Sequence, residues 1–237
     1  MKKFGGAFHL NSASSLVRGG MGGFTLIEMI GVLAVIGVLA ALIVPKVFDI
    51  ISSSKIEAFA SAVKTFEAAV TKYYSDVGSV KPLDVAGNPQ LDNSGHSATV
   101  ESLPARLTLS QFDPLVLTTN LWPRFKGPYL ERFNTDSPPG LGTKVYMPVK
   151  AAETYGTPVT GTNLGWDLKG DDGNNDLPTG AAVAYIFVSS VSEEEFLEFD
   201  ALVDRDIGST PSEKELRGRA KWDPLNNGTL KLYLAHQ

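Results

Sequence analysis

A long apolar run lies near the start of this sequence. Sixteen consecutive residues from Met29 to Val44 carry no charge, and the residues from Phe24 to Ile27 extend the run towards the amino terminus. Together they reach about 20 residues, the length that a helix needs to cross a bilayer. A single acid, Glu28, interrupts the run. A carboxylate inside a membrane helix costs roughly 2.5 to 3.5 kcal/mol, so we interpret Glu28 as a functional residue that needs a partner.

An apolar stripe with helical spacing follows this run. Its members recur at alternating spacings of three and four, which predicts one face of a helix. Gly78 is a typical helix stop. We therefore predict one helix over residues 24–77, which has 54 residues and a length of about 81 Å. The stripe consists of Ile56, Phe59, Val63, Phe66, Val70, Tyr73 and Val77, and four charged residues lie off it: Glu57, Lys64, Glu67 and Lys72.

Short strands and loops are the expectation for the remaining chain. Proline and glycine are spread through residues 79–180, where residues 115–117 and 145–147 form short apolar segments typical of brief strands. Better strand candidates come later, because residues 181–191 and 229–235 are rich in β-forming side chains. We predict that these two segments are members of an antiparallel sheet.

Two helix starts are visible between those strands. Residues Ser192 to Glu195 have the pattern of a capping box, in which a serine and a glutamate three residues later satisfy each other's backbone donors. A second, shorter helix start is expected at Pro211 and Ser212 with Glu215. The helix after the capping box is predicted to turn three apolar residues inward: Phe196, Phe199 and Val203.

The segment Gly23-Phe24-Thr25-Leu26-Ile27-Glu28 resembles the processing site of type IV prepilins and of the related pseudopilins of type II secretion. The resemblance implies that a membrane peptidase cuts between Gly23 and Phe24 and methylates the new amino terminus. Pro45 lies twenty-one residues beyond Phe24, where a helix-kinking proline is common in these proteins. The resemblance also implies an α+β, pilin-like fold, in which a long N-terminal helix packs on a C-terminal antiparallel sheet.

The expected organisation has four parts. Residues 1–23 are a leader that is removed, residues 24–45 a transmembrane helix that becomes the filament core, residues 46–78 an amphipathic helix, and residues 79–237 a globular α+β domain.

The leader also predicts the orientation in the membrane. It contains Lys2, Lys3 and Arg18 and no acid, and positive charge keeps a short flank cytoplasmic. We expect a single pass through a bacterial inner membrane, with the C-terminal domain in the periplasm or, in a filament, outside the cell. An alternative is an uncleaved signal anchor with the same orientation.

The resemblance implies a partner for Glu28. Cleavage turns the backbone nitrogen of Phe24 into a free amine, and opposite charges attract strongly in a medium of low dielectric constant. In this family the acid neutralises the amine of a neighbouring subunit, so a subunit in the wrong register leaves both charges buried and unpaired. The alternative is that Glu28 lies at the membrane interface, reaches towards the headgroups and plays no part in assembly.

The charge balance and the absence of cysteine restrict the possible functions and the sources of stability. Without the three basic residues of the leader, 18 Lys and Arg remain against 26 Asp and Glu, a formal net charge of −8. This acidic balance disfavours binding to nucleic acid. There is no cysteine, so the exported domain has no disulfide and depends on its core or on a bound ion.

A loop rich in acids and amides is a candidate calcium site. Carboxylate and amide oxygens are the ligands that calcium prefers, and major pseudopilins have a calcium site in a late loop. The spacing departs from an EF-hand, with Leu177 at the glycine position and Val183 at that of the final glutamate. The alternative is a solvated turn, and no cofactor is required. The candidate ligands are Asp167, Asp171, Asp172, Asn174 and Asp176.

No arrangement typical of an enzyme is present. The three histidines are isolated from one another at His9, His96 and His236, so the pattern offers no paired-histidine metal or catalytic site. We expect a structural subunit of a type II secretion pseudopilus or a type IV pilus. Its partners would be other pilin or pseudopilin subunits, the prepilin peptidase and methyltransferase, and the inner-membrane assembly machinery. The alternative is a minor or tip pilin, or a membrane-anchored module that binds a surface, secreted cargo or DNA.

Overall fold

The computed structural model describes residues 23–114, 116, 122–136, 138–152, 165–169, 175–205, 207, 217–224 and 226–237. The chain divides into two compact units, Met1–Val47 and Phe48–Gln237. The described part has a long apolar N-terminal helix followed by an antiparallel sheet, the α+β, pilin-like arrangement predicted from the sequence.

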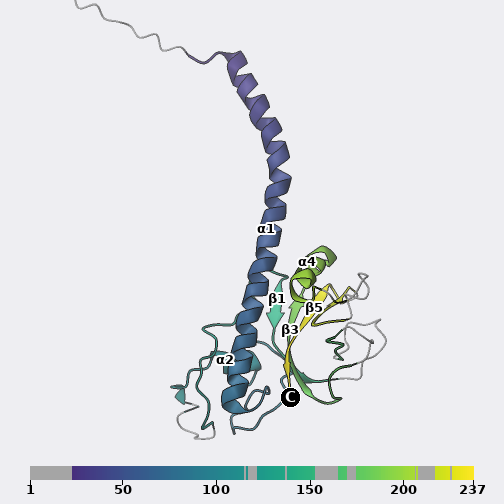
Figure 1. Ribbon diagram of the computed structural model, residues 1–237. Coiled ribbons are helices and arrows are strands. Elements are labelled where there is room, and N and C mark those ends of the chain that lie inside the picture. The colour runs from purple at the N-terminus through teal and green to yellow at the C-terminus, as the bar shows by residue number, and fades with distance from the viewer. Residues whose placement is uncertain are drawn as a thin grey trace, which may run out of the picture. The chain divides into compact units, whose positions relative to one another are not determined.

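The long helix α1 spans Leu26–Val77 without a break (Figure 1). It begins two residues later than predicted, because Thr25 serves as its N-cap. It ends where predicted, since Gly78 takes a left-handed conformation with φ of +82° and its N–H donates to the carbonyl of Tyr74 at 2.7 Å. A side chain at this φ would be strained, so the glycine fixes the end of the helix.

The second half of α1 contributes one buried face to the core. The predicted stripe is confirmed for six of its seven members, and Val77 is half-buried rather than buried. The structure adds a buried alanine and a buried acid to this face. Phe59 packs against Phe199 of the short helix α4, with ring centroids 5.2 Å apart. The buried residues of α1 are Ile56, Phe59, Val63, Phe66, Ala69, Val70, Tyr73 and Asp76.

The sheet is antiparallel and has the strand order β1-β3-β5-β4, with β2 also paired to β3. The predicted strands at 181–191 and 229–235 are confirmed as the two central strands β3 and β5, in which Ile186 lies opposite Leu232. The strand predicted around 145–147 is confirmed as β1. The bounds are β1 Lys144–Tyr146, β2 Val149–Ala151, β3 Ala182–Ser189, β4 Ala220–Asp223 and β5 Thr229–His236.

Both faces of β3 are covered. Ala184, Ile186 and Val188 face the main core, which they share with α1. Val183 and Tyr185 belong to a second cluster on the other face with Trp166 and Leu177. Alternate residues of a strand point to opposite faces, so β3 is apolar along its whole length rather than alternating with polar residues.

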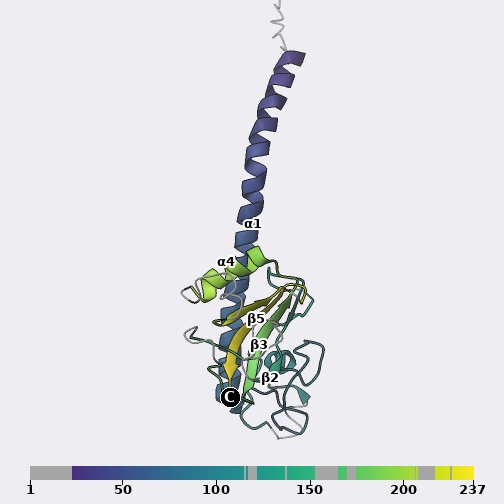
Figure 2. The same cartoon turned by 90° about the vertical axis from the view of Figure 1, so that its right-hand side faces the viewer.

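Two helices flank this sheet. Helix α4, Glu193–Val203, begins at the predicted capping box, where Ser192 Oγ accepts from Glu195 N at 3.3 Å and Ser192 N donates to Glu195 Oε2 at 2.9 Å. Phe196 and Phe199 are buried and Val203 packs against the core, as predicted. Figure 2 shows α4 across one end of the sheet, with the second half of α1 behind.

Outside the long helix and the central strands, two predictions differ from the structure or lie outside it. Helix α2, Leu103–Thr108, and strand β4 were not predicted. The expected short strand at 115–117 is wrong at Val116, which is helical. The expected helix start at Pro211, Ser212 and Glu215 lies outside the described residues.

Candidate functional site

Thr25 and Glu28 form a capping box at the start of α1. The N–H and the hydroxyl of Thr25 both donate to Glu28 Oε2, at 2.8 and 2.7 Å. In return the N–H of Glu28 donates to Thr25 Oγ1 at 3.3 Å. The first N–H groups of a helix have no partner within the helix, so this exchange satisfies two of them. The signal is present in the sequence as T-x-x-E, but of the two such boxes only the one at Ser192 was predicted.

The capping box occupies only one oxygen of Glu28. Oε2 accepts both bonds from Thr25, whereas Oε1 makes no hydrogen bond within the described chain. Glu28 is exposed, as are Gly23 and Phe24 beside it, and Phe24 has 77% of its surface accessible. Glu28 also makes no ion pair with any described residue. The carboxylate therefore caps its own helix while one of its oxygens remains open to a second partner.

The first half of α1 exposes an apolar surface. Every residue from 23 to 51 is exposed, and most of them are large aliphatic side chains. By length and composition α1 is the one helix in the described chain that is able to cross a membrane. A contiguous apolar surface of this size marks a region that meets a membrane or another protein.

Pro45 lies inside α1, and helical structure continues on both sides of it. Proline has no N–H, so the carbonyl of Ala41 lacks its usual donor four residues along the helix. That loss weakens α1 at this point. The kink that the sequence predicts at Pro45 stays a prediction.

The candidate calcium ligands are only partly described. Asp167 is buried with its carboxylate 3.8 Å from the Arg217 guanidinium, and Asp176 pairs with Lys169 at 2.8 Å. The hydrogen bond from Lys169 holds the pKa of Asp176 below its ordinary value. Both carboxylates thus face a cation of the chain itself. Asp171, Asp172 and Asn174 lie outside the described residues, and no group of three potential metal-ligating side chains exists within those described.

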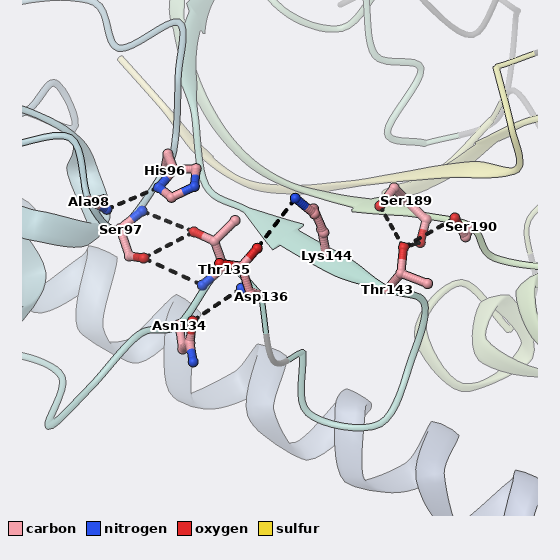
Figure 3. A network of polar contacts seen from close by, with 10 residues as sticks. All are labelled: His96, Ser97, Ala98, Asn134, Thr135, Asp136, Thr143, Lys144, Ser189 and Ser190. Atoms are coloured by element: carbon pink, nitrogen blue, oxygen red, sulfur yellow. Dashed lines mark hydrogen bonds and ion pairs between the residues drawn. The ribbon is translucent and has the colours of Figure 1, made fainter.

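Polar side chains also gather beside β1 and the end of β3 (Figure 3). Ser97 and the buried Thr135 bond each other through their hydroxyls at 3.1 Å. Thr143 Oγ1 lies 3.1 Å from the hydroxyls of both Ser189 and Ser190. These bonds tie neighbouring loops to the sheet, so the cluster has a structural explanation.

His96, in the same view, uses its Nδ1 to accept from the N–H of Ala98 at 3.0 Å. A backbone N–H thus occupies Nδ1. This nitrogen is therefore not free to take a proton from a hydroxyl, as a general base would.

Comparison with known proteins supports a pilin-type chain at a coarse level. The chain is 40% identical over 78 residues to the fimbrial protein EcpC of Eikenella corrodens. This match covers 33% of the present chain and 46% of the relative, so it spans less than half of that protein's length. No family model matches the chain. No solved structure matches it significantly.

Proposed function

We propose that this chain is a structural subunit of a helical cell-envelope filament, cleaved between Gly23 and Phe24 and assembled through α1. The observation that carries the proposal is the exposure of every residue from 23 to 51 on a single helix that is apolar except for a few charges. Such a helix must be covered first by lipid and, in a filament, by the same helix of other subunits. The fimbrial relative supports the role of a pilus-type subunit.

Glu28 has two roles in this proposal. Its Oε2 closes the capping box with Thr25, and its Oε1 receives the amine of Phe24 from a neighbouring subunit. Cleavage before Phe24 leaves the Thr25 N–H as an ordinary amide, so the capping box survives processing. The charge pair then sets the register of assembly, because a misplaced subunit leaves an unpaired carboxylate among apolar helices.

Processing and assembly require partners, and they fix where the chain lies before assembly. A prepilin peptidase removes residues 1–23 and methylates Phe24, and inner-membrane machinery extracts the subunit into the filament. Before assembly the chain crosses the inner membrane once with its N-terminus in the cytoplasm. Mass spectrometry of the mature chain tests processing directly, because the proposal requires a methylated N-terminal Phe24.

Three substitutions separate the capping role of Glu28 from its charge. Glu28→Gln keeps a side chain that is able to cap and removes the charge, since glutamine also serves at this position of a capping box. Thr25→Ala removes the cap partner and keeps the charge. Glu28→Leu removes both. We expect all three chains to be inserted and cleaved, and only the Thr25→Ala chain to enter filaments.

The readout is the amount of subunit in filaments sheared from cells, relative to the amount in the membrane. Normal filaments from Glu28→Gln would refute the charge pair. If Thr25→Ala abolished filaments as completely as Glu28→Leu, capping rather than charge would be the role of Glu28.

A further inference from the structure

The exposed apolar surface of α1 extends beyond the part that a bilayer covers. Residues 24–51 form 28 helical or helix-flanking positions, whereas about 20 residues span the hydrocarbon core. The surplus lies at the far end, after the charged Lys46. There Phe48, Ile50 and Ile51 are 66%, 65% and 44% exposed.

These side chains spread around the helix instead of following the buried stripe. With 3.6 residues per turn, Ile50 lies roughly 180° around the helix from the mean direction of the buried stripe that starts at Ile56, Ile51 lies roughly 80° from it, and Phe48 roughly 20° from it. The sheet that buries the stripe is therefore on the wrong side of the helix to cover Ile50, and Ile51 lies beside the stripe rather than on it. Another molecule must do so if these apolar groups are to leave water.

A groove able to receive apolar side chains lies further along the same helix. It has a volume of about 510 Å³ and runs between α1 and the loop that precedes β1. Its floor is apolar, since the rings of Phe66 and Phe133 lie 5.5 Å apart there. Charged side chains stand on its rim. Six of the residues that line it are Ala62, Thr65, Phe66, Glu131, Arg132 and Phe133.

The charges beside the groove are complementary to those beside the exposed segment. Lys46 and Asp49 flank the apolar side chains of the segment, and Glu131 and Arg132 stand on the rim of the groove. None of these four residues makes an ion pair with any part of the chain that the structure describes. Asp49 is thus available to Arg132, and Lys46 to Glu131.

We propose that residues 48–51 of one copy dock into the groove of a second copy, with Asp49 beside Arg132. This inference rests on the proposed filament and names one of its subunit contacts. If the two copies are parallel, they are offset by about 21 Å, because Ile51 and Thr65 are fourteen residues apart at about 1.5 Å each. The contact lies outside the membrane-spanning half of α1. It would therefore add specificity that the apolar helices alone lack.

The chain contains no cysteine, so in a cross-linking test only introduced cysteines are able to form disulfides. A chain carrying both Ile51→Cys and Thr65→Cys is unable to close a disulfide within itself, because about 21 Å of helix separates positions that a disulfide requires within about 7 Å. In oxidised filaments each such chain would bond to two neighbours. We expect a ladder of covalent multimers on a non-reducing gel.

The matched control combines Ile51→Cys with Val85→Cys. Val85 is also exposed, at 51%, but does not line the groove, so this pair should give no ladder. Charge reversal supplies a second measurement. Arg132→Asp in the cross-linking chain should lower the cross-linked fraction several-fold, and adding Asp49→Arg should restore it.

The outcomes separate this contact from the proposed function. Filaments that contain the Ile51→Cys/Thr65→Cys chain but give no ladder overturn the contact and leave the filament role intact. If the parent chain forms no filaments before any cross-linking, both the contact and the filament role are overturned. If the cysteine pair itself prevents assembly, the charge variants are tested in the cysteine-free chain. A filament yield that falls with Arg132→Asp and returns when Asp49→Arg is added supports the contact. A yield that neither change affects overturns it.

Discussion

Glu67 of α1 forms an ion pair with Arg219, the residue before β4. The same guanidinium group donates to the carbonyl oxygen of Tyr233 on β5 at 3.2 Å. Because the two side chains are only 27% and 35% exposed, water screens this pair less than a surface pair. The ion pair thus joins the long helix to the β4 edge of the sheet, at a position that lies off the apolar stripe.

We expect Glu67→Ala and Arg219→Ala each to lower the free energy of unfolding by about 1 to 2 kcal/mol, since each leaves a half-buried charge without its partner. Urea denaturation of a fragment that begins at Ser52 measures this. The double variant should lose less than the sum of the two single losses. Lys64→Ala is the control, because Lys64 also lies off the stripe and makes no ion pair among the described residues. Additive losses would show that the pair does not couple helix and sheet.

A second prediction concerns the buried carboxylate of Asp204, just after α4. Its Oδ2 accepts from the N–H groups of Arg219 and Ala220, at 2.6 and 2.7 Å. Burial nevertheless raises the pKa of Asp204 above its ordinary 3.8. A raised pKa in the folded state means that the folded protein binds the proton more tightly. The stabilisation from this group is therefore full below 3.8 and is lost as the pH rises through the folded-state pKa.

Asp204→Asn removes this titration while keeping an oxygen that accepts hydrogen bonds. We expect the variant to lose less stability than the parent as the pH rises from about 3 to 7. Asp204→Ala removes the acceptor and should cost about 1 to 3 kcal/mol at every pH, because two buried N–H groups lose their partner. Urea midpoints across this pH range test both statements. Parallel pH profiles for the parent and Asp204→Asn would contradict the raised pKa.

Local patterns explain why much of the fold was predictable. The stripe from Ile56 to Tyr73, the central strands β3 and β5 and the capping box at Ser192 are each encoded within a few neighbouring residues. Strand β4 is different. Its residues Ala220–Asp223 form a strand because they pair with β5 and because Asp204 binds the backbone N–H groups at the start of the strand, contacts that sequence spacing does not reveal.

The start of α1 shows the same division. The acid at position 28 stood out because it is the exception in an apolar run, but its bond to Thr25 needed the geometry of the helix start. Glu67 lay off the stripe in the sequence, and only the fold brings Arg219 to it across 152 residues. The groove beside Phe133 was not predictable, because its two walls come from α1 and from an irregular loop.

The domain should need no metal to fold. Asp176 is paired with Lys169, and Asp167 faces Arg217, so two of the five candidate calcium ligands already have a cation nearby. We expect the fragment from Ser52 to unfold at the same temperature in chelator and in calcium. A calcium-dependent rise in that temperature, abolished by Asp171→Ala with Asp172→Ala, would instead identify the loop as a calcium site. Glu131→Ala, at an exposed loop position whose side chain makes no ion pair with the described residues, is the matched control for the loss of an acid.

Gln237, the last described residue, forms hydrogen bonds with the residues that follow the end of α1. The Gln237 side chain accepts from Ser79 Oγ at 2.9 Å and from the N–H of Val80 at 3.2 Å, and its amide donates to the Gly78 carbonyl at 3.3 Å. Its backbone meanwhile pairs with Ala182 at the start of β3, with both bonds at 2.9 Å. One residue thus connects the end of the long helix to the central strand.

We expect Gln237→Ala to cost about 1 to 2 kcal/mol, because the N–H of Val80 and the carbonyl of Gly78 both lose a partner near the end of the helix. Gln237→Glu keeps the acceptor but not the donor, so its loss should be smaller. Gln111→Ala is the control, since the Gln111 side chain is exposed and makes no hydrogen bond within the described chain. Hydrogen exchange supplies the local measurement, because the Val80 amide should lose protection in Gln237→Ala and keep it in Gln237→Glu. Equal protection in all three variants would show that water replaces these bonds without cost.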